Sequence, residues 1–411
     1  MPTGPPYPEV AVTGLGLVTP AGIGVAASWA RILRGEPTAA PDPALAGLPV
    51  DFSCRVPGFH AEELVGRRLA WRTDRYTHLA LVAAREAVAD AGLDPACWDG
   101  ARVGVVVGNA LGGTETYERQ QQVLRDEGAK QVSPMVIPMM GISMVAGYLA
   151  IDARATGPNL VTVTACASGT TAIGTALQLL RSGACDVVLA GGTEASLTPT
   201  VIAGFAQMGA LSRRSADPAA ASRPFDVDRD GFVPAEGAGM LVLERLADAR
   251  ARGATVRARL AGYGASADAY HATSPDPAGA GVERAIRCAL ADAGVAPGEV
   301  DHVNAHGTST PLNDVAEATV LRRVFGARPA VTSVKGVTGH SLGGAGAIEA
   351  ACTVLSVQHG VVPPTANLSR PDPHIECDVV TEAARTMPVR VAISNSFGFG
   401  GQNAVLVLSA A

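Results

Sequence analysis

Two stretches of this 411-residue chain follow the same plan, although they lie far apart in the sequence. Residues 164–183 read TACASGTTAIGTALQLLRSG, and residues 338–360 read TGHSLGGAGAIEAACTVLSVQHG. Both predict a turn that leads into a helix made largely of small residues. Because small side chains let helices approach each other closely, we expect both helices to be buried near the centre of the molecule.

A second repeated pattern divides the chain into two similar halves. The helix signal REAVADAGLDP (85–95) precedes the strand RVGVVVG, and RCALADAGVAPGEV (287–300) precedes the strand DHVNAHGTST. Near residue 255, the segment ARARGATVRARL starts a new strand. We therefore predict two related halves, residues 1–255 and residues 256–411.

Most of the expected strands are continuous apolar runs, which are typical of sheets covered on both faces. EVAVTGLGLVTP, ARVGVVVGNALGG, CDVVLAGGTEA and GMLVLERL are of this kind, and THLALVAAREAVADAGL predicts a helix that ends at Gly92. Hydrophobic residues make up 47% of the chain and charged residues only 17%, so a large core can be buried. The pattern indicates a layered α/β fold.

Charge and cysteine content limit the classes of function. The net charge is −6, whereas nucleic-acid-binding proteins usually carry a basic surface, so we expect no nucleic-acid partner. The seven cysteines form no CxxC pair, their number is odd and no secretory signal precedes them. This predicts reduced thiols in the cytoplasm and no zinc site. No apolar run approaches the length of a membrane span.

Cys166 stands where a predicted strand passes into the first small-residue helix. Unpaired backbone N–H groups at a helix N-terminus favour a thiolate, so we expect Cys166 to be an activated nucleophile. The small neighbouring residues leave room for a bulky substrate. A buried, unreactive cysteine is the alternative, and this interpretation fits the other six cysteines.

Two histidines in the second half lie in comparable positions. His306 follows the strand of VNAHGTSTPLND, and His340 occupies a glycine-bounded turn in SVKGVTGHSLGG. Ligands of open α/β sheets gather at the carboxyl ends of strands, where we expect both imidazoles. A structural role is the alternative for each of them.

A glycine-rich turn, Phe397-Gly398-Phe399-Gly400-Gly401, interrupts the last two predicted strands in ISNSFGFGGQNAVLVL. Backbone N–H groups in such a turn can form an oxyanion hole. An aromatic ring on a glycine hinge can also act as a gate. A plain hairpin is the alternative.

Two further motifs carry weaker signals. GHSLGG (339–344) matches the nucleophile elbow of α/β-hydrolases, with Ser341 as nucleophile, but no predicted strand leads directly into it. GLGLVT (14–19) is similar to a dinucleotide-binding turn, but Thr19 replaces its last glycine. We retain the hydrolase only as a minor alternative and reject the dinucleotide site.

Together, TACASG, NAHGTSTPLND, SVKGVTGHSLGGAG and NSFGFGGQN resemble the four signatures of the β-ketoacyl-acyl-carrier-protein synthases. These are elongating condensing enzymes of the thiolase-like superfamily. The resemblance covers nearly the whole chain, from VAVTGLGLVTPAG to the last strand. It implies a five-layered αβαβα fold of two related halves, and a dimer with the strand before Cys166 at the interface.

The resemblance implies a decarboxylative Claisen condensation. Cys166 would accept an acyl group as a thioester, and His306 and His340 would donate N–H to the enolate formed from a malonyl thioester. The backbone N–H groups of Cys166 and Phe399 would hold the tetrahedral oxyanion. We expect no metal and no redox cofactor, because the substrates arrive on the phosphopantetheine arm of acyl carrier protein.

The resemblance also assigns supporting residues. Lys335, one of only two lysines, would form an ion pair with Glu317 and fix the histidine turn. The gate would consist of Phe399 with Phe397, Gly400 and Gly401, next to a second loop around Asp268. The residues assigned to the acyl pocket are Leu111, Met135, Met139, Thr308 and Thr310.

The expected partner, acyl carrier protein, is acidic, so docking on this acidic chain requires a local basic patch. Two arginine-rich segments and the second lysine are the candidates for this patch. The docking residues that we predict are Arg67, Arg68, Arg72, Lys130, Arg213 and Arg214. Scattered, solvated side chains are the alternative.

Three functions are consistent with the motifs. GHSLGG, PPTANLSRPDP and QNAVLVL look closer to polyketide ketosynthases, whereas NAHGTSTP and NSFGFGG look closer to fatty-acid enzymes. The first hypothesis is the catalytic ketosynthase of a type II polyketide or polyene pathway, as a homodimer or as a heterodimer with a chain-length-factor homologue. The second is a housekeeping fatty-acid elongation enzyme of the KAS II type. The third, a non-catalytic chain-length-factor-like subunit, is disfavoured because the cysteine and both histidines are present.

Overall fold

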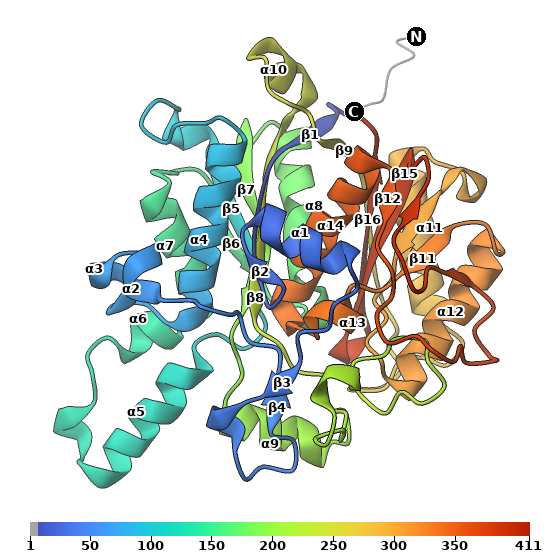
Figure 1. Cartoon of the computed structure of the whole chain (residues 1–411). Coiled ribbons are helices and arrows are strands. Elements are labelled where there is room, and N and C mark those ends of the chain that lie inside the picture. The colour runs from blue at the N-terminus through green and yellow to red at the C-terminus, as the bar shows by residue number, and fades with distance from the viewer. Residues whose placement is uncertain (1–6) are drawn as a thin grey trace.

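The apolar runs of the sequence form one mixed sheet in the computed structural model, which describes residues 7–411. The strands of this sheet are β1 (Val10–Thr19), β2 (Gly22–Ile23), β5 (Val103–Gly108), β6 (Asn159–Thr162), β7 (Val187–Glu194), β8 (Gly237–Arg245), β9 (Ala258–Ala267), β10 (His302–Asn304), β11 (Ala330–Thr332), β13 (Asp378–Val379), β15 (Val391–Gly398) and β16 (Gln402–Ser409). They pair in the order β13-β11-β10-β15-β16-β9-β1-β8-β7-β5-β6, and β2 pairs with β1 (Figure 1).

The two halves repeat one strand order, which accounts for the internal repeat of the sequence. The order β1-β8-β7-β5-β6 in the first half corresponds to β9-β16-β15-β10-β11 in the second. In both halves the third, fourth and fifth strands of this order are parallel, and the remaining pairs are antiparallel. An antiparallel pairing of β1 with β9 at residues 10–12 joins the halves.

Helices lie between the two halves of the sheet and on both outer faces. The two small-residue segments form α8 (Ser168–Arg181) and α14 (Ala345–His359), which contact each other and strands of both halves. The outer helices are α4 (Arg75–Asp90), α7 (Met144–Asp152), α11 (Ala280–Ala293) and α12 (Pro311–Phe325). The first two cover one half and the last two cover the other (Figure 1). The predicted five-layered αβαβα arrangement is thus confirmed, with both small-residue helices at its centre.

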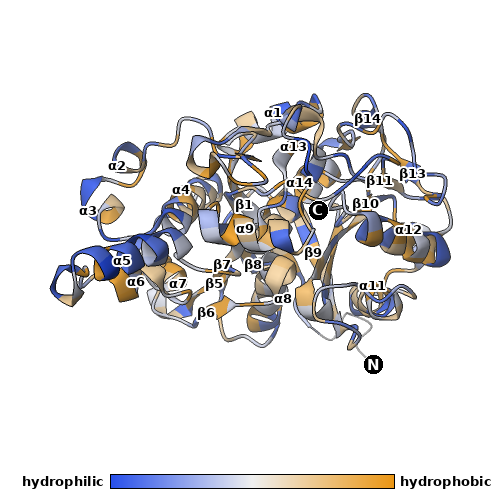
Figure 2. Cartoon of the chain, turned by 90° about the horizontal axis from the view of Figure 1, so that it is seen from below, coloured by the Kyte–Doolittle hydropathy of each residue, from blue (hydrophilic) through white to orange (hydrophobic). Residues whose placement is uncertain are grey.

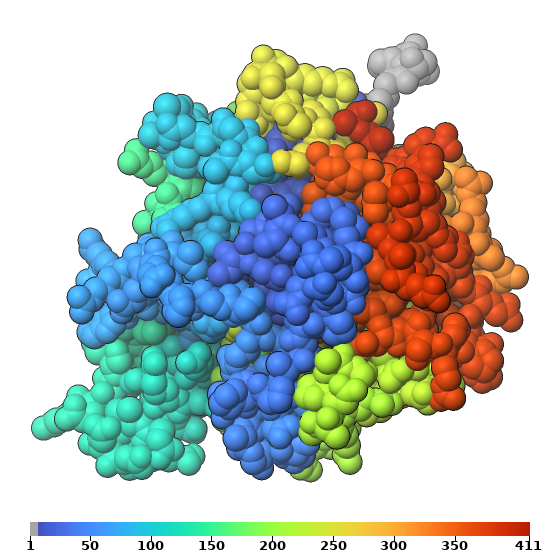
Figure 3. Space-filling model, viewed as in Figure 1, coloured from blue at the N-terminus to red at the C-terminus, as the bar shows by residue number. Residues whose placement is uncertain are grey.

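The remaining elements lie outside these layers, except α13, which is buried beside His340. They are α1 (Val25–Leu33), α2 (Ala61–Leu64), α3 (Arg67–Ala70), α5 (Thr114–Asp126), α6 (Val136–Met140), α9 (Pro199–Gln207), α10 (Leu246–Ala251), α13 (Lys335–Thr338), β3 (Ala40–Pro41), β4 (Phe52–Ser53), β12 (Val361–Val362) and β14 (Arg385–Thr386). The α5 helix extends away from the sheet and is largely hydrophilic (Figure 2). Figure 3 shows an N-terminal part of the chain, in blue, at the surface between other N-terminal-half segments in lighter blue and cyan and C-terminal segments in red. Within residues 7–411, no helix is long and apolar enough to cross a bilayer.

The GLGLVT segment belongs to a strand, which explains its glycines. Residues 14–19 lie entirely within β1. A Cβ on Gly16 would overlap the carbonyl oxygen of Ala83, because α4 packs directly on the strand at this point. The segment therefore lacks the strand-to-helix turn that a dinucleotide site requires.

We predict that Gly16→Ala lowers the free energy of unfolding by about 2–3 kcal/mol, because the added methyl group overpacks the contact between β1 and α4. Gly204→Ala is the matched control, since Gly204 lies in α9 and a Cβ there would have no neighbour within 4 Å. The control should gain about 0.5–1 kcal/mol from the higher helix propensity of alanine. Denaturant unfolding measures both changes, and equal stabilities for the two variants would contradict this account of the packing.

Candidate active site

Cys166 lies at a sharp turn between β6 and α8. The chain passes through a 3₁₀ turn at Ala165–Ala167 before the helix begins. Ala165 has a φ of 48°, a strained conformation for a residue with a side chain and one that recurs at functional sites. Gly398 packs against this turn so closely that a Cβ there would lie 3.0 Å from the backbone nitrogen of Cys166. The turn thus holds the buried cysteine in a fixed position.

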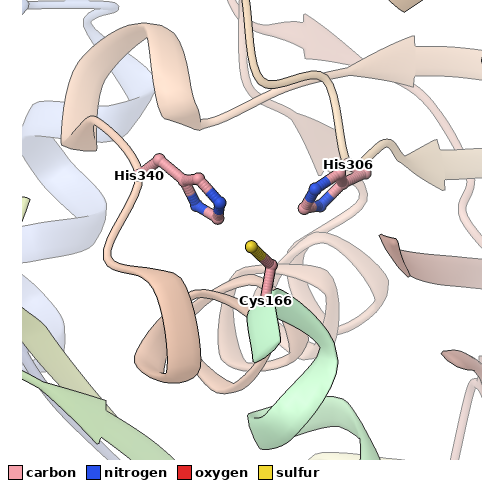
Figure 4. Close-up of side chains that lie close together, drawn as sticks. All are labelled: Cys166, His306 and His340. Atoms are coloured by element: carbon pink, nitrogen blue, oxygen red, sulfur yellow. The ribbon is translucent and has the colours of Figure 1, made fainter. Parts of the chain in front are cut away.

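His306 and His340 come from the second half and face Cys166. His306 follows β10, and His340 lies between α13 and the 3₁₀ turn Leu342–Gly344. The sulfur and one nitrogen of each ring all lie within 4.8 Å of one another, and the sulfur points between the rings (Figure 4). A sulfur and two imidazole nitrogens are also donors that Zn²⁺ accepts, and they form the one such cluster within residues 7–411.

Burial keeps both imidazoles neutral. It lowers the pKa of His306 and of His340 well below the usual value, and the positive charge of Lys335 acts in the same direction. Lys335 Nζ lies 3.5 Å from His306 Nδ1 and can only donate, so the ring proton of His306 resides on Nε2. The Nδ1 of His340 is buried in the protein, which leaves Nε2 to face the substrate space. Neutral imidazoles can donate a hydrogen bond or accept a proton.

The prediction of an ion pair between Lys335 and Glu317 is wrong. Lys335 Nζ pairs instead with Glu349 of α14, and it donates to the backbone oxygen of His306 at 2.7 Å. Glu317 accepts from the backbone N–H groups of His306 at 2.9 Å and Gly307 at 2.8 Å. Both carboxylates therefore hold the His306 loop, one through the lysine and one directly. The only sequence signal for Glu349 is its isolation as a charged residue within the small-residue helix.

The burial of Cys166 opposes the thiolate that the helix N-terminus favours. Burial raises the pKa of Cys166 to about 11. The charge of Lys335 and the backbone N–H of Phe399 oppose this rise only in part. Desolvation of the sulfur therefore outweighs the effect of the helix N-terminus. The thiol must therefore lose its proton during the attack, next to the two neutral imidazoles.

The glycine-rich turn covers one side of the cysteine. Gly400 has a φ of 80°, and its N–H donates to the carbonyl oxygen of Ala272 at 2.7 Å. The N–H of Asp268 donates to the carbonyl oxygen of Gly401 at 2.9 Å. The turn and the loop around Asp268 are thus hydrogen-bonded to each other. Any movement of Phe399, whose backbone N–H reaches the sulfur, must involve both segments.

A cavity of about 610 Å³ leads to Cys166. Six of the residues predicted for the gate and the acyl pocket line it, namely Leu111, Thr308, Thr310, Phe397, Phe399 and Gly401. Three lining residues that sequence analysis missed are Phe205, Phe232 and Leu342. Phe205 and Phe232 are ordinary apolar residues outside the motifs discussed above, whereas Leu342 lies within GHSLGG, where nothing marks it as a cavity residue.

Met135 and Met139 do not line this cavity, contrary to the expectation for the acyl pocket. They lie at the start of α6 and within it, and both are half-buried. Leu111 and Val163 do line the cavity and are 38% and 51% exposed, respectively. The cavity therefore reaches the surface at the sheet edge formed by β6.

The candidate docking residues occupy separate surface segments. Arg67 and Arg68 lie on α3, Arg72 follows it, and all three are exposed. In the part of the chain that the structure describes, none of these three side chains forms an ion pair. Lys130 and Arg213 are exposed as well. Arg214 differs, because it is half-buried and donates to the backbone oxygen of Asp228 at 2.6 Å.

The hydrolase alternative finds no support in this geometry. Ser341 is buried in the turn between α13 and the 3₁₀ turn at Leu342–Gly344, and no strand leads into it. A nucleophile elbow requires a strand that ends at the serine.

We predict that alkylation of Cys166 by iodoacetamide accelerates about tenfold per pH unit from pH 6 to pH 9, because the thiolate fraction rises with pH below a pKa near 11. Peptide mass spectrometry follows the reaction, with exposed Cys288 as the internal reference. A rate for Cys166 that is already constant above pH 7 would show a thiolate and contradict the burial argument.

Comparisons with known proteins agree with this geometry. Family models of the N-terminal and C-terminal domains of β-ketoacyl synthase match residues 8–249 and 257–369. The 3-oxoacyl-[acyl-carrier-protein] synthase 2 of Synechocystis sp. is 45% identical over 405 residues, which cover 97% of each chain. The synthase 2 of Staphylococcus aureus is 43% identical over 404 residues, again 97% of each chain.

Solved structures share the complete fold. The ishigamide ketosynthase/chain length factor superposes with a TM-score of 0.92 at 35% identity, covering 98% of this chain and 100% of that chain. A type II PKS acyl-carrier protein in complex with its ketosynthase bound to the hexaketide matches with a TM-score of 0.89 at 34% identity and the same coverage. With its cysteine and two histidines gathered in one cavity, the chain belongs to the β-ketoacyl synthase family and is a condensing acyltransferase of the thiolase-like fold.

Proposed function

We propose that this enzyme extends an acyl group, held on Cys166, by decarboxylative condensation with a malonyl group carried on acyl carrier protein. The observation that carries the proposal is the spacing of three reacting atoms. The Cys166 sulfur and one nitrogen each of His306 and His340 lie within 4.8 Å of one another. One nucleophile and two neutral proton donors in a buried cavity are the groups that this reaction needs.

In the first step, the thiol of Cys166 attacks the thioester carbonyl of the incoming acyl group. The thiol proton ends on the sulfur of the departing phosphopantetheine arm, and both imidazoles keep the Nε2–H that the second step uses. The backbone N–H groups of Cys166 and Phe399 hold the negative charge that develops on the carbonyl oxygen. The result is an acyl group on Cys166 and a free thiol on the carrier arm.

In the second step, the malonyl group loses CO₂ and the electron pair of the broken C–C bond forms an enolate. The Nε2–H of His306 and the Nε2–H of His340 donate to the enolate oxygen. The enolate carbon then attacks the acyl carbonyl, and Cys166 leaves as a thiolate that recovers a proton. The product is a 3-oxoacyl thioester. Because the broken C–C bond supplies the electrons, the reaction as proposed requires no redox cofactor.

The supporting residues position these groups. Lys335, anchored by Glu349, donates to the backbone oxygen of His306 at 2.7 Å and keeps Nδ1 of that ring free of a proton. Glu317 fixes the same loop through two backbone N–H groups. Thr308 and Thr310, which the resemblance assigned to the acyl pocket, line the cavity next to His306, and we propose that they contact the entering carrier arm instead of the acyl chain.

Two pathways remain as finer proposals. The relatives named 3-oxoacyl-[acyl-carrier-protein] synthase 2 are 43–45% identical, which favours chain elongation of the KAS II type. The ishigamide ketosynthase, at 35% identity, supports the type II polyketide or polyene alternative that several motifs favoured. A non-catalytic chain-length-factor-like role is disfavoured, because such a subunit would have no use for the assembled cysteine and histidines.

We propose acyl carrier protein and a second chain as partners. The unpaired Arg67, Arg68 and Arg72 offer the positive charge that an acidic carrier protein needs. For the second chain, the edge strand β6 offers unpaired backbone groups, and Ile151, 75% exposed on α7, offers apolar surface nearby. A partner there would close the cavity where it reaches the surface and could bring its own α6 methionines to it, whether the partner is a second copy or a chain-length-factor homologue.

We predict that His306→Ala and His340→Ala each slow condensation by about 10²–10³-fold, because each removes one donor to the enolate oxygen. Transfer of the acyl group to Cys166 should suffer less, since that step forms no enolate oxygen and its oxyanion is held by backbone N–H groups. Intact-protein mass spectrometry follows acylation, and release of the 3-oxoacyl product follows condensation. Cys166→Ala is the control and should show no acylated protein. Equal losses in both steps would contradict the separate role of the histidines.

The pathway is tested by product analysis with malonyl-loaded carrier protein. Saturated long chains that depend on a full reductive set of enzymes identify fatty-acid elongation, whereas unreduced or polyene products identify the polyketide alternative. Sizing of the protein alone and with candidate partners distinguishes a species of about twice the 41.6 kDa chain from an obligate heterodimer.

A further inference from the structure

Glu194 is a buried carboxyl group that the proposed mechanism does not use. It ends β7, has no exposed surface, and no arginine or lysine pairs with it among residues 7–411. Its oxygens accept from the backbone N–H of Ala110 at 2.9 Å and from Ser196 Oγ at 2.7 Å. The backbone N–H groups of Leu111 and Gly343 lie near enough to lower its pKa. A Cβ on Gly344 would lie 3.2 Å from the Glu194 backbone nitrogen, so the turn after His340 also packs against Glu194. A buried carboxyl without a cation is costly, so these donors must compensate for its desolvation.

These backbone N–H groups belong to two segments that both line the substrate cavity. Ala110 and Leu111 follow β5, whereas Gly343 belongs to the turn that follows His340. The segments touch, because a Cβ on Gly343 would lie 2.5 Å from the backbone nitrogen of Ala110. Leu342, which lines the cavity in the second segment, has a strained φ of 42° and needs support from its surroundings.

We infer that Glu194 is a positioning residue that clamps the Leu111 segment to the His340 turn and thereby determines which acyl chains the cavity accepts. The inference rests on the proposed function, in which the acyl chain on Cys166 extends into this cavity. Leu111 is 38% exposed, so packing alone restrains it weakly. Its position depends on the hydrogen bond that Glu194 accepts from the backbone N–H of Ala110, the residue before it.

The direction of the effect follows from this arrangement. With the clamp intact, Leu111 and Leu342 form a closed wall that limits the length of the acyl group. When Glu194 no longer holds the two segments together, this wall moves outward, and Cys166 is acylated by long acyl groups faster relative to short ones. The clamp lies on the acyl side of the site and should leave the chemistry of the histidines in place.

Glu194→Gln is the first test variant. The amide has the same size. Its NH₂ group, however, must face at least one backbone N–H that now donates a hydrogen bond to the carboxylate. Acylation of Cys166 by butyryl- and tetradecanoyl-loaded carrier protein is measured by intact-protein mass spectrometry. Because burial raises the pKa of Glu194 to about 7, the rates are measured at pH 8.5, where its carboxyl group is ionised. We expect the ratio of the tetradecanoyl rate to the butyryl rate to rise about tenfold, the loss expected for one charged hydrogen bond. A role only in folding would lower both rates together.

Gly343→Ala is the second variant, because its methyl group would push the two segments apart while Glu194 stays in place. It should raise the same ratio. The matched control is Glu244→Gln, which also replaces a buried glutamate, but one on β8 that pairs with Arg252 outside the cavity lining. The control should lose stability and keep the wild-type ratio.

The outcomes separate the inference from the function on which it rests. If wild-type enzyme accepts neither acyl group on Cys166, the proposed function fails. If wild type is acylated but the ratio for Glu194→Gln stays within about twofold of it, a difference worth only ~0.4 kcal/mol, the clamp is refuted. Should Glu194→Gln not fold, an unchanged ratio in Gly343→Ala refutes it equally. A shift of the same size in Glu244→Gln would also overturn the inference, because general destabilisation would then explain the result.

Discussion

The close packing of α8 against α14 is the constraint on which the rest of the site depends. A Cβ on Gly169 would lie 2.8 Å from the backbone nitrogen of Ala347, and one on Gly346 would overlap the side chain of Thr170. Cys166 lies just before the first of these helices, and His340 lies just before the 3₁₀ turn that leads into the second. Because almost no side chain separates the helices, the nucleophile of one half reaches the imidazole of the other.

Burial then determines the protonation of the site. Desolvation raises the pKa of the Cys166 thiol and lowers the pKa values of His306 and His340, so all three reacting groups are neutral at rest. The acidic and basic groups next to the histidines are Lys335, Glu349 and Glu317, and all three are buried. A water-poor cavity strengthens every N–H group that is aimed at a developing oxyanion. The resting enzyme thus holds no free thiolate. Negative charge develops only during the reaction, on oxygen atoms that N–H groups already face.

The sequence predicted the reacting groups better than the residues that hold them. A cysteine and two histidines at predicted strand ends and turns carry a recognisable signal, as does the glycine-rich turn. The partner of Lys335 was not predictable, because Glu317 and Glu349 both lie in helices and the packing of those helices decides which one faces Nζ. The sequence did not mark Glu194 as a positioning residue, because the backbone N–H groups around it occur in every segment of a chain. The raised pKa of Cys166 could not be predicted, because burial is a property of the whole fold, whereas the helix terminus is visible locally.

The central claim is that one cavity receives the sulfur from the first half and both imidazoles from the second. A crystal structure of the enzyme acylated on Cys166 tests it most directly. We predict a thioester oxygen within hydrogen-bond reach of the backbone N–H of Phe399, an acyl chain that passes Leu111, and both imidazoles facing the thioester. An acyl-enzyme in which either imidazole turns away from the thioester, or in which the chain leaves past Thr308 and Thr310, would contradict the account.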